Sequence, residues 1–313
     1  MLFISAIGGG AYLMACGSDG SEFDNSRGDG GGLNGDGSDN GGGFGEGGFG
    51  EGGSGGDGGE CEHVIQAVIR DFKPCNAQIT GSEEADDQGC KDSAQGHPDF
   101  EHFQGDEATT GIVAEALSLP DRKPAYVGDG PHHYPNQPNK FETTSKTAFD
   151  AWYHDVAGDG LNANRRIIVP LELKETITDA GAKHYVFDDR TFFPIDGKGF
   201  GNGPKEQNGN PATHNFAFTT EAHFSFVYNG GEEFTFRGDD DLWLFINNKL
   251  AIDLGGLHPE LLATVKLDEQ AARLGLVKGQ RYPMDLFHAE RHTTASRFRI
   301  DTTIECVSNS PVH

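Results

Sequence analysis

Three adjacent aspartates, Asp239, Asp240 and Asp241, stand between two apolar segments at 234–236 and 242–246. Neighbouring carboxylates repel one another, and a bound cation offsets that repulsion. Ca²⁺ takes about 6–8 oxygen ligands, which carboxylates supply. The alternative is a solvated acidic turn. Because the flanking segments are strongly apolar, the turn is expected to have a fixed geometry, and both interpretations stay open on the residues alone.

Four further polar residues are candidates for ligand binding. Asn247 follows the second apolar segment, and its alternative role is a simple turn. Asp253 precedes a Gly-Gly pair, so it either caps that turn or faces the site. His258 lies before a proline in an expected loop. Glu290 is followed by Arg291, and an internal ion pair between these two is favoured over ligand contact.

Short β-strands are the elements expected to position these residues. The segments have alternating or β-branched character and are separated by Asn-Gly, Gly-Gly and Gly-Asp turns. They are 64–69, 166–173, 184–187, 216–219, 222–228, 233–237, 242–246, 250–254, 263–267, 282–287 and 298–304. This spacing predicts an all-β fold, an antiparallel β-sandwich. No alternation of strands and helices is present, which argues against a parallel sheet.

One or two short helices are expected beside the strands. The first lies within 141–157, where Ser145 is a candidate N-cap and Phe149, Trp152 and Val156 recur at helical spacing. The second lies near 269–274. Trp243 alternates with leucines on its strand, and a core position is favoured over a platform for stacking sugars.

Several motifs resemble the fibro-slime domain, a relative of the protective-antigen-type carbohydrate-binding β-sandwich. They are the segments 238–247, 253–258 and 287–292, together with 192–197, 214–216 and 152–153. The resemblance extends over 64–304, nearly all of the expected folded part. It implies a two-sheet sandwich with jelly-roll character.

The resemblance also implies a ligand set. In sugar-binding members of the wider family, two consecutive aspartates joined by a cis peptide hold a Ca²⁺ ion that also binds sugar hydroxyls. Carried over, that pair is Asp239 and Asp240. Asp241 stands where relatives more often have glycine or a small residue, so it either adds a ligand or is only a surface charge.

The cysteines indicate an oxidising compartment. Apart from Cys16, the chain has Cys61, Cys75, Cys90 and Cys306, an even number that fits two disulfides. Four cysteines can pair in three ways, and the scheme with Cys75–Cys90 and Cys61–Cys306 is favoured. Metal binding is the alternative, but no closely spaced pair supports it.

The N-terminus has the character of a targeting segment. Residues 1–15 are apolar and too short to span a bilayer, which is typical of a signal peptide. Their ending resembles a bacterial lipobox, which makes Cys16 the lipidated first residue and implies a cell-surface protein anchored by lipid in the outer membrane. The leader lacks the usual Lys or Arg, and an ordinary cleaved signal with an incidental cysteine is the alternative. Residues 16–60 are predicted to form a Gly-rich, acidic, disordered tether before a folded domain at 61–313.

Composition limits the function. The chain has 49 acidic and 24 basic residues and a net charge of −25, which argues against binding nucleic acid or an anionic membrane. Asp240 and Glu290 could form a glycosidase pair, but nothing in the sequence positions them, and no catalytic motif is present. We therefore expect a non-enzymatic surface lipoprotein that binds extracellular polysaccharide or glycoconjugate through Ca²⁺. The alternative is a structural matrix or adhesion component that binds protein partners, with calcium only structural.

Overall fold

A computed structural model describes residues 61–73, 96–100, 107–203, 213–291 and 295–312. The expected leader, the lipidation site Cys16, the Gly-rich tether and the Cys75–Cys90 pair lie outside these residues. In the described part of the chain, no helix has the length and apolar character needed to cross a membrane.

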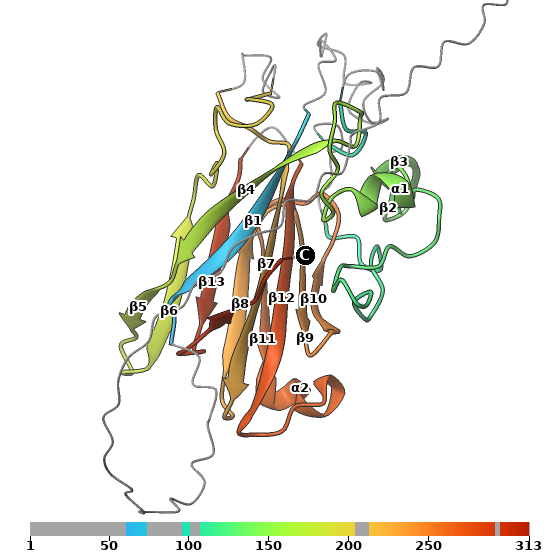
Figure 1. The fold of residues 1–313 in the computed structure, drawn as a ribbon. Helices are drawn as coiled ribbons and strands as arrows, with labels where there is room; N and C mark the ends of the chain where they lie inside the picture. The colour runs from blue at the N-terminus through green and yellow to red at the C-terminus, as the bar shows by residue number, and fades with distance from the viewer. Residues whose placement is uncertain (1–60, 74–95, 101–106, 204–212, 292–294, 313) are drawn as a thin grey trace, which may run out of the picture. The chain divides into compact units, whose positions relative to one another are not determined.

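Antiparallel pairing builds two main sheets (Figure 1). The seven-stranded sheet has, in spatial order, β10 (Lys249–Leu254), β9 (Asp241–Ile246), β12 (Gln280–Glu290), β7 (Phe218–Tyr228), β1 (Val64–Phe72) and β4 (Asn164–Glu172), with β14 (Ser308–Asn309) also paired to β7. The five-stranded sheet has β11 (Leu261–Lys266), β8 (Glu233–Gly238), β13 (Phe298–Thr302), β6 (Lys183–Asp189) and β5 (Lys174–Ile177). A hairpin of β2 (His132–Tyr134) and β3 (Gln137–Thr143) and two helices, α1 (Lys146–Asp150) and α2 (Leu267–Leu274), complete the fold. The predicted all-β antiparallel sandwich is confirmed.

The main core lies between the two sheets. On β7, alternate residues such as Phe224 and Phe226 point inward, and on β8 Phe234 and Phe236 do the same. All four side chains are almost completely buried. Burying a side chain of this size contributes about 1.5–3 kcal/mol relative to leaving it exposed. The two-residue period of the strands therefore builds this core directly from the sequence.

A second core lies on the opposite face of the seven-stranded sheet. The segment containing β2, β3 and α1 covers that face, and Phe149 and Trp152 pack there beside Trp243 and Phe287. Trp243 is fully buried, so the core position predicted for it is confirmed. The central strands of the seven-stranded sheet are consequently buried on both faces along most of their length, whereas the edge strand β4 exposes one face.

Some element boundaries differ from the predictions. The segments 216–219 and 222–228 largely form one strand, β7. The helix predicted within 141–157 is only α1, although Ser145 does cap it, with its Oγ accepting from the Ala148 amide at 3.2 Å. Asn164 donates from its side-chain amide to the carbonyls of Ala151 at 3.0 Å and His154 at 2.8 Å, and these bonds hold the following chain in an irregular path. The exposed strand β5 was not predicted, since it shows no alternation of buried residues.

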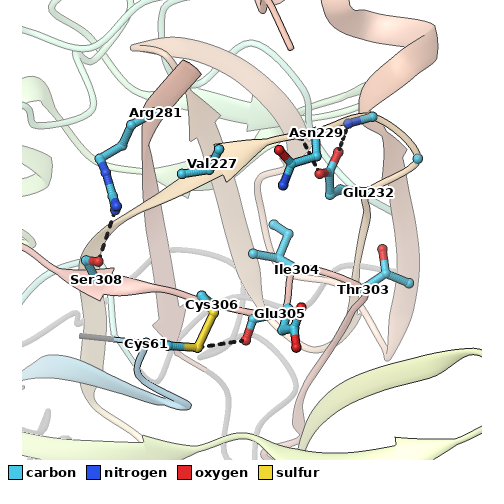
Figure 2. Close-up of a pocket in the computed structure, with 12 residues that line it drawn as sticks. Cys61, Val227, Asn229, Glu232, Arg281, Thr303, Ile304, Glu305, Cys306 and Ser308 are labelled. Carbon is cyan, nitrogen blue, oxygen red and sulfur yellow. Dashed lines mark hydrogen bonds between the residues drawn. A yellow bond between two sulfur atoms is a disulfide. The ribbon is translucent and has the colours of Figure 1, made fainter. Parts of the chain in front are cut away.

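A disulfide joins the two ends of the folded part. Cys61 and Cys306 are bonded, as predicted, across a sequence separation of 245 residues. Figure 2 shows the bond beside a pocket of about 590 Å³, where Arg281 on β12 donates to Ser308 at 3.0 Å. Glu62 and Val307 form a β-bridge next to the bond. The disulfide thus fixes the start of β1 next to β14.

Removing this bond is expected to lower the free energy of unfolding. Because it closes a very long loop, the chain-entropy estimate gives a loss of about 5 kcal/mol for a Cys61→Ser/Cys306→Ser variant. Urea unfolding followed by fluorescence measures the loss, with a Ser308→Ala variant as the control for changes at the same surface. A variant as stable as the native chain would show that the bond contributes nothing.

Candidate functional site

The three aspartates lie where the chain crosses from one sheet to the other. β8 of the five-stranded sheet ends at Gly238, and β9 of the seven-stranded sheet begins at Asp241. A side chain on Gly238 would lie 2.2 Å from the carbonyl oxygen of Arg297, so only glycine fits the start of this crossing. We call Asp239 and Asp240 at this crossing the acidic corner.

The acidic corner is buried. Asp239 is 8% exposed and Asp240 is 3% exposed, so a solvated acidic turn is excluded. Asp239 Oδ1 accepts from the backbone amide of Arg297 at 2.6 Å, and Asp240 Oδ2 accepts from that of Arg291 at 2.9 Å. The second oxygen of each carboxylate accepts no hydrogen bond from another residue in the described ranges. The prediction of a cis peptide between the two aspartates is wrong, since the described residues have a cis peptide bond only at Leu119–Pro120.

Burial makes these carboxylates difficult to ionise. Desolvation, followed by repulsion from Asp240, raises the pKa of Asp239 to about 7. Desolvation raises the pKa of Asp240 to about 6, against the opposing positive charge of Arg291. Ionising both carboxylates at neutral pH therefore costs free energy that a bound cation would offset.

Asp241 belongs to a different arrangement. Its Oδ2 accepts from Arg291 Nε at 2.5 Å, and its Oδ1 accepts from Arg291 Nη2 at 3.1 Å and from the Gly256 amide at 2.6 Å. Both oxygens are engaged and the side chain is fully buried. Neither expectation for Asp241, an additional metal ligand or a surface charge, fits this ion pair, because the side chain is buried and both of its oxygens already accept hydrogen bonds.

Arg291 connects three elements around the corner. Besides Asp241, its guanidinium donates from Nη1 to the Glu142 carbonyl on β3 at 2.6 Å and lies 4.8 Å from the Trp152 ring. The Glu142 carboxylate is 3.7 Å from Nη2. The ion pairs of Arg291 are thus with Asp241 and Glu142, in place of the internal pair expected with Glu290.

The other candidate residues separate into two groups. Asn247 has a φ of 52° in the turn between β9 and β10, and its side chain donates to the Leu274 carbonyl at 2.8 Å. Asp253 accepts from Trp243 Nε1 at 2.9 Å and from the Gly111 amide at 2.9 Å. These contacts give both residues a role in holding local structure, away from the corner.

His258 and Glu290 lie closer to the corner. His258 is buried, with Nδ1 2.9 Å from the Pro259 carbonyl oxygen and Nε2 3.1 Å from that of Leu254. Both contacts are with carbonyl oxygens, which only accept hydrogen bonds. The coulombic effect of His258 lowers the pKa of both aspartates of the corner, and it is smaller than the effect of desolvation. Glu290 is fully buried at the end of β12.

One residue at the corner was given no role from the sequence. His288 is fully buried, and its Nε2 lies 3.0 Å from the Asp239 carbonyl oxygen. Desolvation lowers the pKa of His288 to about 4, so the ring is neutral at pH 7 and donates from Nε2. The ring lies between the two sheets and holds the backbone of the acidic corner through this hydrogen bond.

Among the described residues, no group of three or more His, Cys, Asp or Glu side chains could hold a metal ion. The acidic corner therefore supplies two carboxylates and no closed ligand set. Any further ligands of a cation there would come from backbone oxygens, water or a bound molecule.

A second buried polar cluster lies on the covered face of the seven-stranded sheet. Glu221 on β7 pairs with Arg70 and, at 2.5 Å, with Lys123 Nζ. His223 lies between two carboxylates: its Nε2 is 2.6 Å from Glu221 Oε1, and its Nδ1 is 2.5 Å from Asp285 Oδ1. The residues of this cluster come from three strands and the covering segment, so the cluster attaches that segment to the sheet.

Opposing effects set the protonation of this cluster. Burial alone would raise the pKa of Glu221, but His223, Arg70 and Lys123 together lower it to about 2. Burial disfavours a charged His223, yet its hydrogen bonds to Asp285 and Glu221 outweigh that effect and raise its pKa. This cluster could not be predicted from sequence patterns, because most of its members are far apart along the chain.

The acidic corner lies in a part of the sequence that matches a known protein family. Residues 198–310 match the PA14 domain. The match contains β7 to β14, whereas β1, β4, β5 and β6 precede it and complete both sheets. The protective-antigen-type part of the sequence resemblance is therefore supported, while the fibro-slime resemblance and the lipoprotein leader stay predictions.

Curated relatives match a larger part of the chain. Protein psiJ of Dictyostelium discoideum is 39% identical over 218 residues, which is 67% of this chain and 29% of that protein. Protein psiC of the same organism is 38% identical over 234 residues, 74% of this chain and 42% of that protein. The chain thus spans less than half the length of either relative. Neither relative is bacterial, so they give no support to the bacterial origin expected from the leader.

Solved structures resemble the chain only weakly. A PA14 sugar-binding domain from an RTX adhesin has a TM-score of 0.25 and 11% identity, over 47% of this chain and 85% of that one. The PA14 domain of the antifreeze protein MpAFP also has a TM-score of 0.25, with 7% identity over 46% of this chain and 88% of that one. Scores this low establish no common fold.

Replacing Arg291 is expected to destabilise the fold strongly. Arg291→Met leaves Asp241 and Glu142 buried without their cation, at a cost of about 3–5 kcal/mol in the free energy of unfolding. Arg166→Met, which removes a half-exposed arginine from β4, is the control and should cost less than about 1 kcal/mol. Denaturant titrations of both variants compare the costs, and similar values for the two would contradict the structural role of Arg291.

His223 is expected to make stability depend on pH. Its pKa in the folded state is raised, so its contribution is complete below the unfolded-state value of about 6.5 and is lost as pH rises through the folded-state value. At pH 5.5 a His223→Gln variant should be less stable by about 2–3 kcal/mol, and the difference should narrow at alkaline pH. Thermal unfolding between pH 5.5 and 9 tests this, with the exposed His133→Gln as control; a constant difference would rule it out.

Proposed function

We propose that this chain is a cell-surface carbohydrate-binding or adhesion module in which Ca²⁺ at Asp239 and Asp240 helps to bind the ligand. The observation that carries the proposal is a pair of buried, adjacent carboxylates at the crossing between two sheets, within the residues matched to the PA14 domain. Extracellular polysaccharide or glycoconjugate is the proposed partner.

The geometry of the corner favours a cation over two neutral acids. Each carboxylate is fixed by one backbone amide, from Arg297 or Arg291, and presents its second oxygen for another contact. A divalent cation between these oxygens would offset both the desolvation and the mutual repulsion that raise the two pKa values. Ca²⁺ takes about 6–8 oxygen ligands, and two carboxylates supply only some of them. The remaining positions would be open to water and to sugar hydroxyls.

The position of the corner suits a domain attached through its N-terminus. Cys61 lies close before the start of β1 at Val64. At the other end of the strands, the register places Asp71 opposite Phe218, Phe218 opposite Glu290 and Ala289 opposite Asp241. The corner is therefore at the opposite end of the strands from the disulfide. Attachment through the chain that precedes Cys61 would therefore be at the end of the strands opposite the acidic corner.

The proposal assigns no catalytic step. Binding at one open calcium site is expected to be weak, and many copies on a surface would raise the overall avidity without new contacts. The structural matrix or adhesion role, with calcium only as a support, is the outcome to separate from sugar binding.

Calcium titration calorimetry tests the site. Asp240→Asn keeps an acceptor for the Arg291 amide but removes the charge, and we expect calcium affinity to fall at least about tenfold. Asp179→Asn, an exposed loop residue, is the matched control and should bind calcium like the native chain. Equal titrations for the native chain and Asp240→Asn would remove the calcium site.

A glycan array then tests the ligand. Signals that disappear with a chelator and in Asp240→Asn, but persist in Asp179→Asn, are expected for calcium-dependent sugar binding. Calcium binding with a blank array, together with self-association of the protein, would favour the structural matrix role.

A further inference from the structure

The outer face of the five-stranded sheet carries exposed charges. The register aligns Arg237 on β8 with Arg299 on β13, and Arg299 with Asp188 on β6, in one row across three strands. Because side chains alternate along a strand, these three point away from the main core, whereas their neighbours Phe236, Ile300 and Phe187 pack against it. Arg237 is 55% exposed and Arg299 is 34% exposed at the side chain. This face differs from the outer face of the seven-stranded sheet, which carries the second core.

A groove runs across this face next to the acidic corner. One part is a narrow pocket of about 120 Å³, and the adjoining part has a volume of about 730 Å³; both are lined by Asp188, Asp189 and Arg299. Four arginines and three acids with Phe298 line the narrow part, which we call the arginine groove: Arg190, Arg237, Arg297, Arg299, Asp188, Asp189 and Glu260. The arginine groove thus has a net charge of +1 in a chain whose net charge is −25.

Several guanidinium donors in the groove are not used by the protein. Arg237 Nε and Arg297 Nη1 share the two oxygens of Glu260, the latter at 2.6 Å, which leaves their other terminal nitrogens without a hydrogen bond inside the described ranges. Arg190 is exposed and forms no hydrogen bond or ion pair with a described residue. Arg299 is held by Asp188 at 2.7 Å and Asp301 at 2.8 Å. The acids therefore orient the arginines without using all their donors.

These donors match a planar or tetrahedral anion. A guanidinium presents paired N–H groups in a rigid fork that binds a carboxylate or sulfate through two hydrogen bonds. The wider part of the groove is also lined by Pro170 and Val186, which supply apolar contact for the face of a sugar ring. The groove thus combines anion donors at one end with an apolar surface at the other.

We infer that the arginine groove is a second binding site, which takes carboxylate or sulfate groups of an acidic polysaccharide. The site needs no metal ion, so it does not depend on the calcium site. The two sites are adjacent, since the Arg297 amide holds Asp239 while the Arg297 side chain lines the groove. A single polymer can therefore present hydroxyls to the corner and anionic groups to the groove.

Binding of the full chain to defined polymers tests the second site. The probes are dextran sulfate for sulfate, polygalacturonate for carboxylate, and dextran as the neutral polymer, measured in EDTA at 50 mM and 500 mM NaCl. We expect at least one anionic polymer to bind at low salt, binding to weaken at high salt because charges are screened, and dextran not to bind. EDTA excludes the calcium site, so failure of that site leaves this result unchanged.

Matched variants separate the groove from general charge effects. Arg190→Ala/Arg237→Ala should bind the anionic polymer at least about tenfold more weakly, since it removes two charge-assisted contacts. Lys183→Ala/Lys278→Ala removes two exposed cations outside the groove and should bind like the native chain. Arg190→Lys/Arg237→Lys keeps the charge without the fork and should recover only part of the affinity.

Two results would overturn the inference. One is that neither anionic polymer binds the native chain in EDTA at low salt. The other is an equal loss of affinity in the Ala variants of the groove and of the control lysines, because that pattern indicates long-range attraction with no defined site. Thermal unfolding of each variant confirms that the fold is retained before affinities are compared.

Discussion

Arg291 is a cation buried away from water, and the surroundings of the acidic corner follow from the need to neutralise it. Burying an isolated guanidinium would cost much free energy. The Asp241 and Glu142 carboxylates therefore lie beside the guanidinium of Arg291, and the Glu142 carbonyl accepts a hydrogen bond from it. These partners come from β9 and β3, so one side chain joins the sandwich to its covering segment. The same residue holds Asp240 through its backbone amide. The ion pair thus determines which of three adjacent aspartates remain available for a ligand.

The central strands of the seven-stranded sheet show how a sheet can be buried on both faces. Its inner face is mostly apolar, as the main core requires, and His288 is a buried polar residue on it beside Phe298. Its outer face is apolar around Trp243 and Phe287 but carries Glu221, His223 and Asp285 on the neighbouring positions of β7 and β12. Burial of charged groups is tolerated there because each is paired, and their pairing fixes the covering segment in one position.

The sequence predicts the features that depend on local pattern. Alternation along β7, β8 and β9 identified the strands, Ser145 identified the start of α1, and the acidic run identified the turn between two sheets. Cys61 and Cys306 could be paired because two ends of one domain tend to meet. By contrast, the partners of Arg291 and Glu221 could not be predicted, since Asp241 is 50 residues from the former and Lys123 is 98 residues from the latter. Pairings of this kind depend on sheet order, which the pattern of single strands does not contain.

In the proposed function, the acidic corner and the arginine groove would present opposite charges to one ligand. Arg297 contributes a backbone amide to Asp239 and a side chain to the groove, so the two sites share one strand end. A neutral sugar offers only hydroxyls, which suit a cation with open coordination positions. An acidic sugar offers anions as well, which the corner repels unless a cation is bound and which the guanidinium groups attract with or without it. Calcium would therefore act as more than a ligand bridge, because by neutralising Asp239 and Asp240 it would also remove the repulsion that an acidic polymer meets on its way into the groove.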